Sequence, residues 1–202
     1  RGSSSDIVGL IEVDTGSVRS GGLNQVQKIS QALGYDSSYQ VKYGDASINK
    51  LLPIIRMQGN ALLASSEIHN ERFHYFDAGI KKLVIELELE DCAVFLVHLS
   101  LKYRHRQVQM RHLYDLVKAS DKPVIVAGDF NTLWGDDEIF LFMKATGLQS
   151  ANEQNLPSYP SQAPRREFDY ILYGSDIRMN NFEIPNVTLS DHLPLICDFE
   201  VV

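Results

Sequence analysis

Short apolar runs of strand length recur along the chain, and each is bounded by glycine, proline or polar residues. Residues 82–90 differ from the other runs because leucine and isoleucine alternate with glutamate, which predicts a strand with one face in solvent. Asp91 then turns the chain into the apolar residues 93–98, so we expect these two strands to form a hairpin. The predicted strands are 6–12, 61–65, 82–90, 93–98, 123–129, 168–173 and a last one that begins at Leu195.

The segments between these strands include several with helical spacing. The first predicted helix stops at Gly34, because glycine readily adopts the left-handed backbone of a helix end. The second places Met110, Leu113 and Val117 on one apolar face. The predicted helices are 21–33, 103–120 and 136–146, and residues 156–166, which contain three prolines, are a predicted loop.

The order of these elements is mixed, with strands paired through hairpins and helices between them. Such an order predicts an α+β (α/β) sandwich, in which two sheets pack face to face and helices lie outside. The 202 residues suffice for one domain with a large core and show no internal repeat. No apolar run approaches the roughly 18 residues that span a bilayer. We leave the compartment open, because the two cysteines fit buried apolar positions and form no metal-binding spacing.

The net charge of −7 bears on the substrate. Proteins that grip nucleic acid nonspecifically usually carry a basic face, so the charge favours a small phosphoester or a lipid headgroup over duplex DNA. We interpret the basic stretch at residues 102–112 as the solvated face of a helix. Arg165, Arg166 and Trp134 lie near reactive residues in the sequence and could contact either a nucleotide or a small anionic headgroup.

Reactive polar residues lie where the predicted strands end. Glu12, His98 and Asp129 each finish an apolar strand. Asn131 lies two residues after Asp129, so in extended backbone their side chains share a face and can hold a water, a metal or a phosphoryl oxygen. Because strand ends of this kind converge at one edge of a sheet stack, we expect these side chains to meet.

The C-terminal part of the chain adds an acid in a strand and an Asp-His pair. Asp169 lies within an apolar strand, where a carboxylate is costly without a partner such as an imidazole. Asp191 and His192 are adjacent between a serine and a proline, so they point in different directions and serve different partners. Carboxylates bind divalent cations and an imidazole moves protons at neutral pH. The set therefore predicts metal-assisted attack of water on a phosphoester.

The order of these fragments resembles the endonuclease/exonuclease/phosphatase superfamily, which includes pancreatic deoxyribonuclease, abasic-site endonucleases, neutral sphingomyelinases and inositol-polyphosphate phosphatases. The resemblance covers about residues 6–200 and is carried most specifically by Gly-Asp-Phe-Asn together with Ser-Asp-His-Leu-Pro. The matching fragments are Ile11-Glu12-Val13, Gly59-Asn60-Ala61, His98-Leu99, Arg106 with Gln109, Gly128–Asn131, Phe168–Leu172 and Ser190–Pro194.

The resemblance implies a four-layer sandwich with two mixed β-sheets and one active site. It also implies that Glu12, with Asp191 nearby, coordinates Mg²⁺ or Mn²⁺. The family normally has an upstream strand that bears an asparagine, whereas only eleven residues precede Glu12 here. The resemblance therefore implies that residues 1–202 are a single domain that lacks its N-terminal strand.

The same resemblance implies catalytic roles for five residues. Asp169 orients His192, and either His192 or Asp129 activates the attacking water. His98 and Asn131 stabilise the phosphoryl oxygens. The reaction is in-line displacement at phosphorus, in which the metal and fixed hydrogen-bond donors neutralise the developing charge.

Two alternatives accompany this prediction. The chain is a metal-dependent hydrolase of phosphodiesters or phosphomonoesters, or a DNA or RNA endonuclease or exonuclease of the same fold. In a different class, it is a catalytically inactive binding or scaffold domain. We expect a phosphoester substrate (small molecule, lipid headgroup or nucleic acid), no stable protein partner and a monomer.

Overall fold

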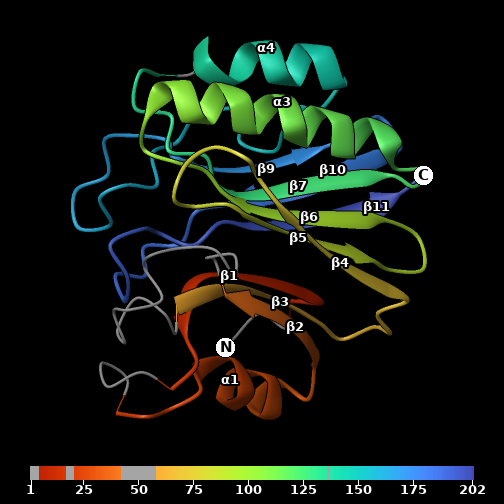
Figure 1. Cartoon of the computed structure of the whole chain (residues 1–202), viewed down its shortest axis with the longest axis vertical. Coiled ribbons are helices and arrows are strands. Elements are labelled where there is room, and N and C mark those ends of the chain that lie inside the picture. Colours follow the sequence, from red (N-terminus) through yellow and green to blue (C-terminus); the bar gives the residue numbers. More distant parts are fainter. Residues whose placement is uncertain (1–4, 17–20, 42–57, 136) are drawn as a thin grey trace.

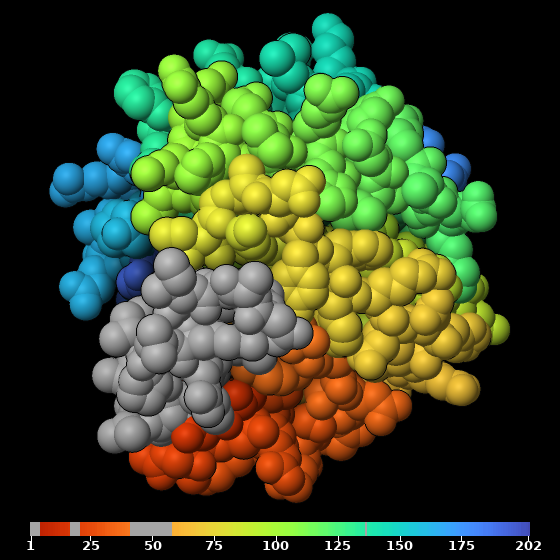
Figure 2. All heavy atoms as spheres, viewed as in Figure 1, coloured from red at the N-terminus to blue at the C-terminus, as the bar shows by residue number. Residues whose placement is uncertain are grey.

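The computed structural model describes residues 5–16, 21–41, 58–135 and 137–202. Two layers of strands lie face to face, and helices cover the outer side of each layer (Figure 1). Helices α3 (Tyr103–Ala119) and α4 (Asp137–Thr146) cover one side, and α1 (Gln25–Leu33) covers the other. The predicted α+β sandwich is therefore confirmed. In Figure 2, which shows one face of the molecule, the green and teal atoms of the α3–α4 side and the orange atoms of the N-terminal part lie toward opposite ends.

The larger sheet has six strands in the order β4-β5-β6-β7-β9-β8. Strands β6 and β7 are parallel, because α3 connects them, and the other neighbouring pairs are antiparallel. The predicted hairpin is confirmed as β5 and β6. The strands are β4 Asn70–Tyr75, β5 Leu83–Glu88, β6 Ala93–His98, β7 Val124–Asp129, β8 Gln149–Ser150 and β9 Asp169–Tyr173.

The second strand layer consists of two small antiparallel sheets. One contains β1 (Ile7–Asp14), β2 (Asp36–Val41) and β3 (Gln58–Ala64) in the order β1-β3-β2. The other pairs β10 (Ile177–Glu183) with β11 (Ile196–Val201). Side chains of both sheets belong to one apolar cluster with β5 and β6, so both pack on the same face of the larger sheet.

Three apolar clusters hold the layers together. Met110, Leu113 and Val117 of α3 pack on one face of the six-stranded sheet, as the helical spacing predicts. The second cluster fills the space between the strand layers, and the third joins β1 and β3 to Val26 of α1. None of the described helices is long and apolar enough to cross a membrane.

The prediction that residues 82–90 form a half-exposed strand is wrong for β5. Residues 83–87 are all buried, including Glu86, which is only 6% exposed. The helix layer covers Val84, and the neighbouring edge strand β4 supplies partners for the carboxylate. Arg72 donates a 2.7 Å hydrogen bond to Glu86, and the His74 ring lies 2.5 Å from its other oxygen. The alternation of apolar and acidic residues in this strand therefore does not reflect a face in solvent, because Glu86 is buried and paired with Arg72 and His74.

Candidate active site

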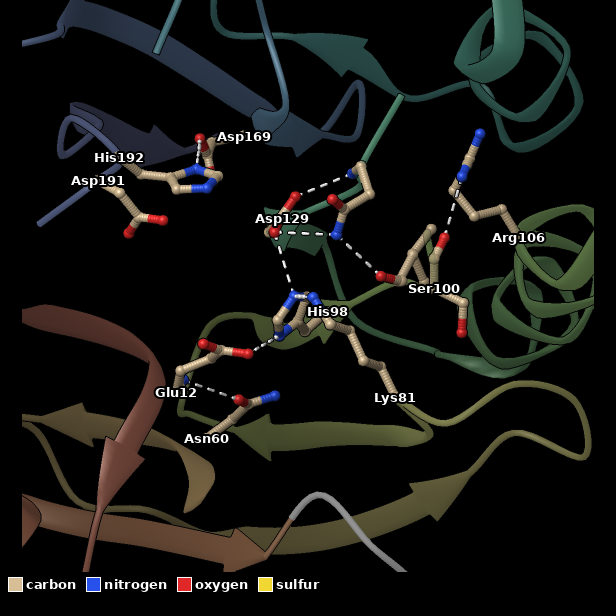
Figure 3. Close-up of polar contacts among 12 residues, drawn as sticks. Glu12, Asn60, Lys81, His98, Ser100, Arg106, Asp129, Asp169, Asp191 and His192 are labelled. Atoms are coloured by element: carbon tan, nitrogen blue, oxygen red, sulfur yellow. Dashed lines mark hydrogen bonds and ion pairs between the residues drawn. The ribbon is translucent and has the colours of Figure 1, made fainter. Parts of the chain in front are cut away.

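Three of the predicted site residues lie side by side across neighbouring strands of the larger sheet (Figure 3). His98 ends β6, Asp129 ends β7 and Asp169 begins β9. In the strand register His98 is the partner of Asp129, and Asp129 is the partner of Asp169. The sheet therefore fixes an imidazole and two carboxylates in one row.

Asp129 is buried and is held by Asn131. Its Oδ1 accepts a 2.9 Å hydrogen bond from the Asn131 backbone N–H, and its Oδ2 accepts a 3.0 Å bond from the Asn131 amide. The same amide donates to the Leu99 carbonyl at 3.0 Å. Asn131 has a φ of 51°, a left-handed conformation that asparagine tolerates better than most residues. The motif thus places an acid and the amide that orients it at the end of β7.

Gly128 is required for the close approach of β6 and β7 at this point. Its φ is 141°, and a Cβ at this position would lie 1.9 Å from the Val97 carbonyl oxygen. Only glycine fits here without moving the neighbouring strand. The glycine of the Gly-Asp-Phe-Asn motif therefore serves the register that pairs Asp129 with His98.

His98 is buried beside Asp129 and a lysine. Its Nε2 lies 3.1 Å from Asp129 Oδ2, and the Lys81 ammonium is in direct contact with the same nitrogen. Burial lowers the pKa of His98, and the hydrogen bond to Asp129 offsets this only in part. Its Nδ1 has no hydrogen-bond partner within the described parts of the chain and lies 4.0 Å from Oε1 of Glu12. His98 is therefore a neutral ring at neutral pH.

Asp169 and His192 form a hydrogen-bonded pair on the other side of Asp129. Asp169 Oδ2 lies 2.7 Å from His192 Nδ1 and accepts a 2.6 Å bond from Ser158 Oγ. The His192 ring packs on Tyr159, with ring centroids 4.8 Å apart. Burial lowers the pKa of His192, but the hydrogen bond and charge of Asp169 and the charges of nearby carboxylates outweigh it, so the pKa is raised. The predicted partnership of Asp169 with an imidazole agrees with this geometry.

Glu12 reaches the site from the opposite strand layer. It lies in a register irregularity of β1, and its φ is 59°. Its backbone N–H donates a 3.3 Å bond to Oδ1 of the fully buried Asn60 on β3. The side chain of Glu12 remains 45% exposed and is directed toward His98 (Figure 3). The bulge therefore aims this acid out of the strand and into the gap between the layers.

Asp191 enters from the loop between β10 and β11 and is exposed. Its backbone carbonyl accepts a 2.7 Å bond from the Ser161 N–H, and its Oδ1 accepts a 3.1 Å bond from Ser190. Asp191 and His192 have different partners, as expected for adjacent residues that point in different directions.

All seven predicted site residues line one cleft with a volume of about 400 Å³. They come from both strand layers and from the C-terminal loop. The cleft is lined by Glu12, His98, Asp129, Asn131, Asp169, Asp191 and His192, together with Lys81, Tyr159 and Arg166 among others.

Further residues that line the cleft include Lys81, which the sequence does not mark, and Tyr159 and Arg166, of which Arg166 is a predicted substrate contact. Lys81 lies in the connection between β4 and β5, where no strand-end motif marks it. Tyr159 and Arg166 lie in the proline-containing loop and form a bridge to each other. The proximity of this loop to Asp169 in the sequence is the signal that predicts a role in substrate contact.

Arg106 and Gln109 of α3 anchor the loops that border the cleft. The Gln109 amide donates to the carbonyls of Ala78 and Lys81 at 2.9 and 2.6 Å. Arg106 is fully buried and donates to the Ser100 carbonyl at 3.1 Å. The interpretation of residues 102–112 as a solvated helix face is therefore wrong for Arg106.

Two groups of residues in the cleft have the chemistry of metal ligands. Ligand atoms of Asp129, Asp169 and His192 lie within 4.8 Å of one another. The Asp169 and His192 atoms of that group are already hydrogen-bonded to each other, which argues for proton handling there. Glu12 and Asp191 instead offer partly exposed carboxylates, the hard oxygen ligands that Mg²⁺ and Mn²⁺ prefer. The metal assignment of Glu12 and Asp191 stays a prediction.

Comparisons with solved structures show that other proteins share this fold. The human Nocturnin catalytic domain with a bound sulfate anion superposes with a TM-score of 0.71 at 20% identity, over 98% of this chain and 81% of that one. D. rerio TDP2 in complex with a single-strand DNA product gives 0.73 at 18% identity, over 98% and 87%. The mannosyl-6-phosphatase of Bacteroides thetaiotaomicron VPI-5482 gives 0.70 at 15% identity, over 96% and 85%.

These three structures share the fold with this chain. No curated protein matches the sequence. The sequence profile of the endonuclease/exonuclease/phosphatase family, however, matches residues 1–192. The chain therefore belongs to the endonuclease/exonuclease/phosphatase family.

Proposed function

We propose that this protein is a divalent-metal-dependent phosphoesterase in which His192 activates a water for attack at phosphorus. The observation that carries the proposal is the hydrogen bond between Asp169 and His192 beside the Asp129 carboxylate, in the cleft that also holds Glu12 and Asp191. An oriented imidazole next to a set of carboxylates is suited to water activation near a cation.

His192 is favoured over Asp129 as the general base. Both oxygens of Asp129 accept hydrogen bonds from Asn131, and one also contacts His98, so this carboxylate is committed to neighbours. His192 uses Nδ1 for Asp169, which leaves Nε2 on the opposite side of the ring for a water. Asp169 thereby fixes the tautomer and stabilises the imidazolium that forms when the proton is taken.

Lys81 and His98 are suited to bind the phosphoryl oxygens. The Lys81 ammonium supplies a positive charge at the floor of the cleft, and the neutral His98 ring supplies a dipole beside it. Asn131 uses its amide for Asp129 and the Leu99 carbonyl, so we assign it a positioning role through Asp129. Fixed charges and dipoles of this kind stabilise the charge that develops at the phosphoryl group.

Glu12 and Asp191 are the residues that would hold the divalent cation, and the cation would supply Lewis-acid stabilisation of the phosphoryl charge. The fit rests on the donor set, because two exposed carboxylates with room for water match the all-oxygen coordination of Mg²⁺. The irregular backbone at Glu12, held through Asn60, supports this role because it turns an acid out of the strand.

The substitution His192→Ala tests the proposal. Loss of the general base is expected to lower kcat for Mg²⁺-dependent hydrolysis of bis-p-nitrophenyl phosphate by about 10²- to 10⁴-fold. His69→Ala, which removes an exposed histidine on the β3–β4 connection, serves as the control and should retain wild-type kcat. Undiminished turnover by His192→Ala would remove the base assignment, and no turnover by the wild-type protein with either Mg²⁺ or Mn²⁺ would favour the scaffold alternative.

A further inference from the structure

A second pocket of about 720 Å³ adjoins the cleft. Leu101 and Leu133 line both the cleft and this pocket, so the two adjoin at these residues. Leu101 follows β6 and Leu133 follows β7, on the same side as His98 and Asp129. A substrate whose phosphate occupies the cleft can therefore extend into the second pocket.

The second pocket is lined by basic and aromatic side chains, although the net charge of the protein is −7. Trp134 and Tyr103 line it with side chains that are 78% and 49% exposed. Lys102, Arg104 and His105 line it as well, so aromatic and cationic side chains share one hollow. Large aromatic rings left in solvent around a concave surface mark a binding site more often than an arbitrary surface does.

Both walls of this pocket are fixed by one buried ion pair. The Arg106 guanidinium donates to Glu138 at 2.6 to 2.8 Å, and it also donates to the carbonyl of Leu101. Glu138 in turn accepts a 2.7 Å bond from the backbone N–H of Trp134. The loop before α3 and the loop before α4 are thus tied to the same pair. The pocket is therefore preorganised, and a ligand does not have to order its walls on binding.

We propose that this pocket binds an unpaired nucleobase attached to the phosphate that occupies the cleft, so that the substrate class is a nucleotide or a single-stranded nucleic acid. This inference rests on the proposed phosphoesterase function. Aromatic side chains stack on any base, and neighbouring cations attract the phosphates that flank it. The hollow shape suits a planar ring, whereas a bilayer surface would be met by a protruding apolar face.

Trp134 allows a direct binding measurement, because it is the only tryptophan of the chain. Stacking of a base on its indole should quench its fluorescence. We expect saturable quenching by hexathymidylate or hexauridylate in EDTA, and none by ribose 5-phosphate, which has the sugar and phosphate without the base. Quenching by either oligonucleotide supports the inference. Quenching by only one of them shows whether the pocket binds single-stranded DNA or RNA. Quenching by ribose 5-phosphate alone, or by phosphatidylserine vesicles alone, overturns it.

The variants Tyr103→Ala and Phe140→Ala form a matched pair. Phe140 is an exposed aromatic residue of α4 that lies outside the pocket lining. Tyr103→Ala should raise the Kd for the oligonucleotide about tenfold, in the range of a single base–aromatic stack. Phe140→Ala should leave this Kd unchanged. Equal Kd values for wild type and Tyr103→Ala would contradict the inference.

Kinetics separate this inference from the proposed function. The measured quantity is the ratio of kcat/KM for thymidine 5′-(p-nitrophenyl phosphate) to that for methyl p-nitrophenyl phosphate. Trp134→Ala should lower this ratio about tenfold, and Phe140→Ala should preserve it. If both esters are hydrolysed and Trp134→Ala keeps the ratio, the nucleobase pocket is wrong while the phosphoesterase stands. If neither ester is hydrolysed but quenching is observed, the phosphoesterase function fails while base binding is retained.

Discussion

Nδ1 of His192 lies 2.7 Å from Oδ2 of Asp169, so that a loop residue and a strand residue of the site are in direct contact. Asp169 is part of the rigid sheet, whereas His192 lies in the loop before β11. The hydrogen bond therefore holds the side chain of this loop residue in a fixed position relative to the sheet. Packing of the ring on Tyr159 restrains it from a second direction.

Asp169→Asn is expected to change the pH profile as well as the rate. Burial lowers the pKa of His192, and Asp169 makes the largest opposing contribution, so the net pKa is raised. A raised pKa means that the free base appears only at higher pH, and activity rises as the pH passes through this pKa. In the asparagine variant the pKa falls, so the acidic limb of kcat/KM should move to lower pH.

The plateau of kcat in the same variant should fall by about 10²-fold or more, because the tautomer of His192 is no longer fixed. Asp115→Asn, on the exposed face of α3, is the control for charge removal. It should leave the acidic limb of kcat/KM and the plateau of kcat unchanged. A plateau loss with an unmoved acidic limb would mean that Asp169 acts on something other than His192.

Glu12→Ala and Asp191→Ala test the cation site without a turnover measurement. Removing one of two carboxylate ligands should weaken Mg²⁺ binding by at least about tenfold in titration calorimetry, because a hard cation loses a charged oxygen. Glu153→Ala removes an exposed glutamate outside the cleft lining and should retain the wild-type affinity. If Asp129→Asn abolishes binding while Glu12→Ala does not, the cation belongs to the group of Asp129, Asp169 and His192.

The sequence could predict that the candidate site residues meet because most of them lie where an apolar run ends. His98 and Asp129 each end an apolar run and Asp169 lies within another, and the sheet register then makes the three residues neighbours. Lys81 carries no such mark. It contacts His98 in the fold, where Gln109, far along the chain, binds the Lys81 carbonyl.

The boundaries of the first helix are predicted correctly at one end only. The stop at Gly34 is confirmed, because this residue has a φ of 72° and caps α1. The predicted start at Gly21 is wrong, since the helix begins at Gln25. Asn24 precedes it and accepts a 3.0 Å bond from the Gln27 N–H. The side-chain cap, rather than the glycine pair, sets the start of the helix.

Gly128→Ala should destabilise the protein by about 3–5 kcal/mol, because the new methyl group would collide with the Val97 carbonyl of the adjacent strand. Gly147→Ala is the matched control. Its φ of 81° carries similar backbone strain, but a Cβ added there would meet none of the described atoms within 4 Å, so a loss of about 1–2 kcal/mol is expected. Urea denaturation measures both. Equal losses would show that strain, and not the approach of β6 and β7, requires glycine at 128.

Glu138→Gln should be among the most damaging changes outside the cleft. The Arg106 guanidinium is fully buried, and without the carboxylate its charge is left uncompensated, which costs about 3–5 kcal/mol. Arg178→Ala breaks an exposed ion pair for comparison. In that pair the side chains of Arg178 and Glu200 are 61% and 55% exposed. The urea midpoint of that variant should stay close to wild type, because exposed pairs stabilise little.

Glu138→Gln also tests how far the ion pair controls the second pocket. Glu138 holds the Trp134 N–H as well as Arg106, so its loss should free the loop before α4. In folded Glu138→Gln at low temperature, the emission of Trp134 should shift and its quenching by hexathymidylate should weaken, while Arg178→Ala retains both. Weakened stability with wild-type quenching would show that the pocket walls are held by other contacts. In that case the buried pair would serve the packing of α3 against α4 alone.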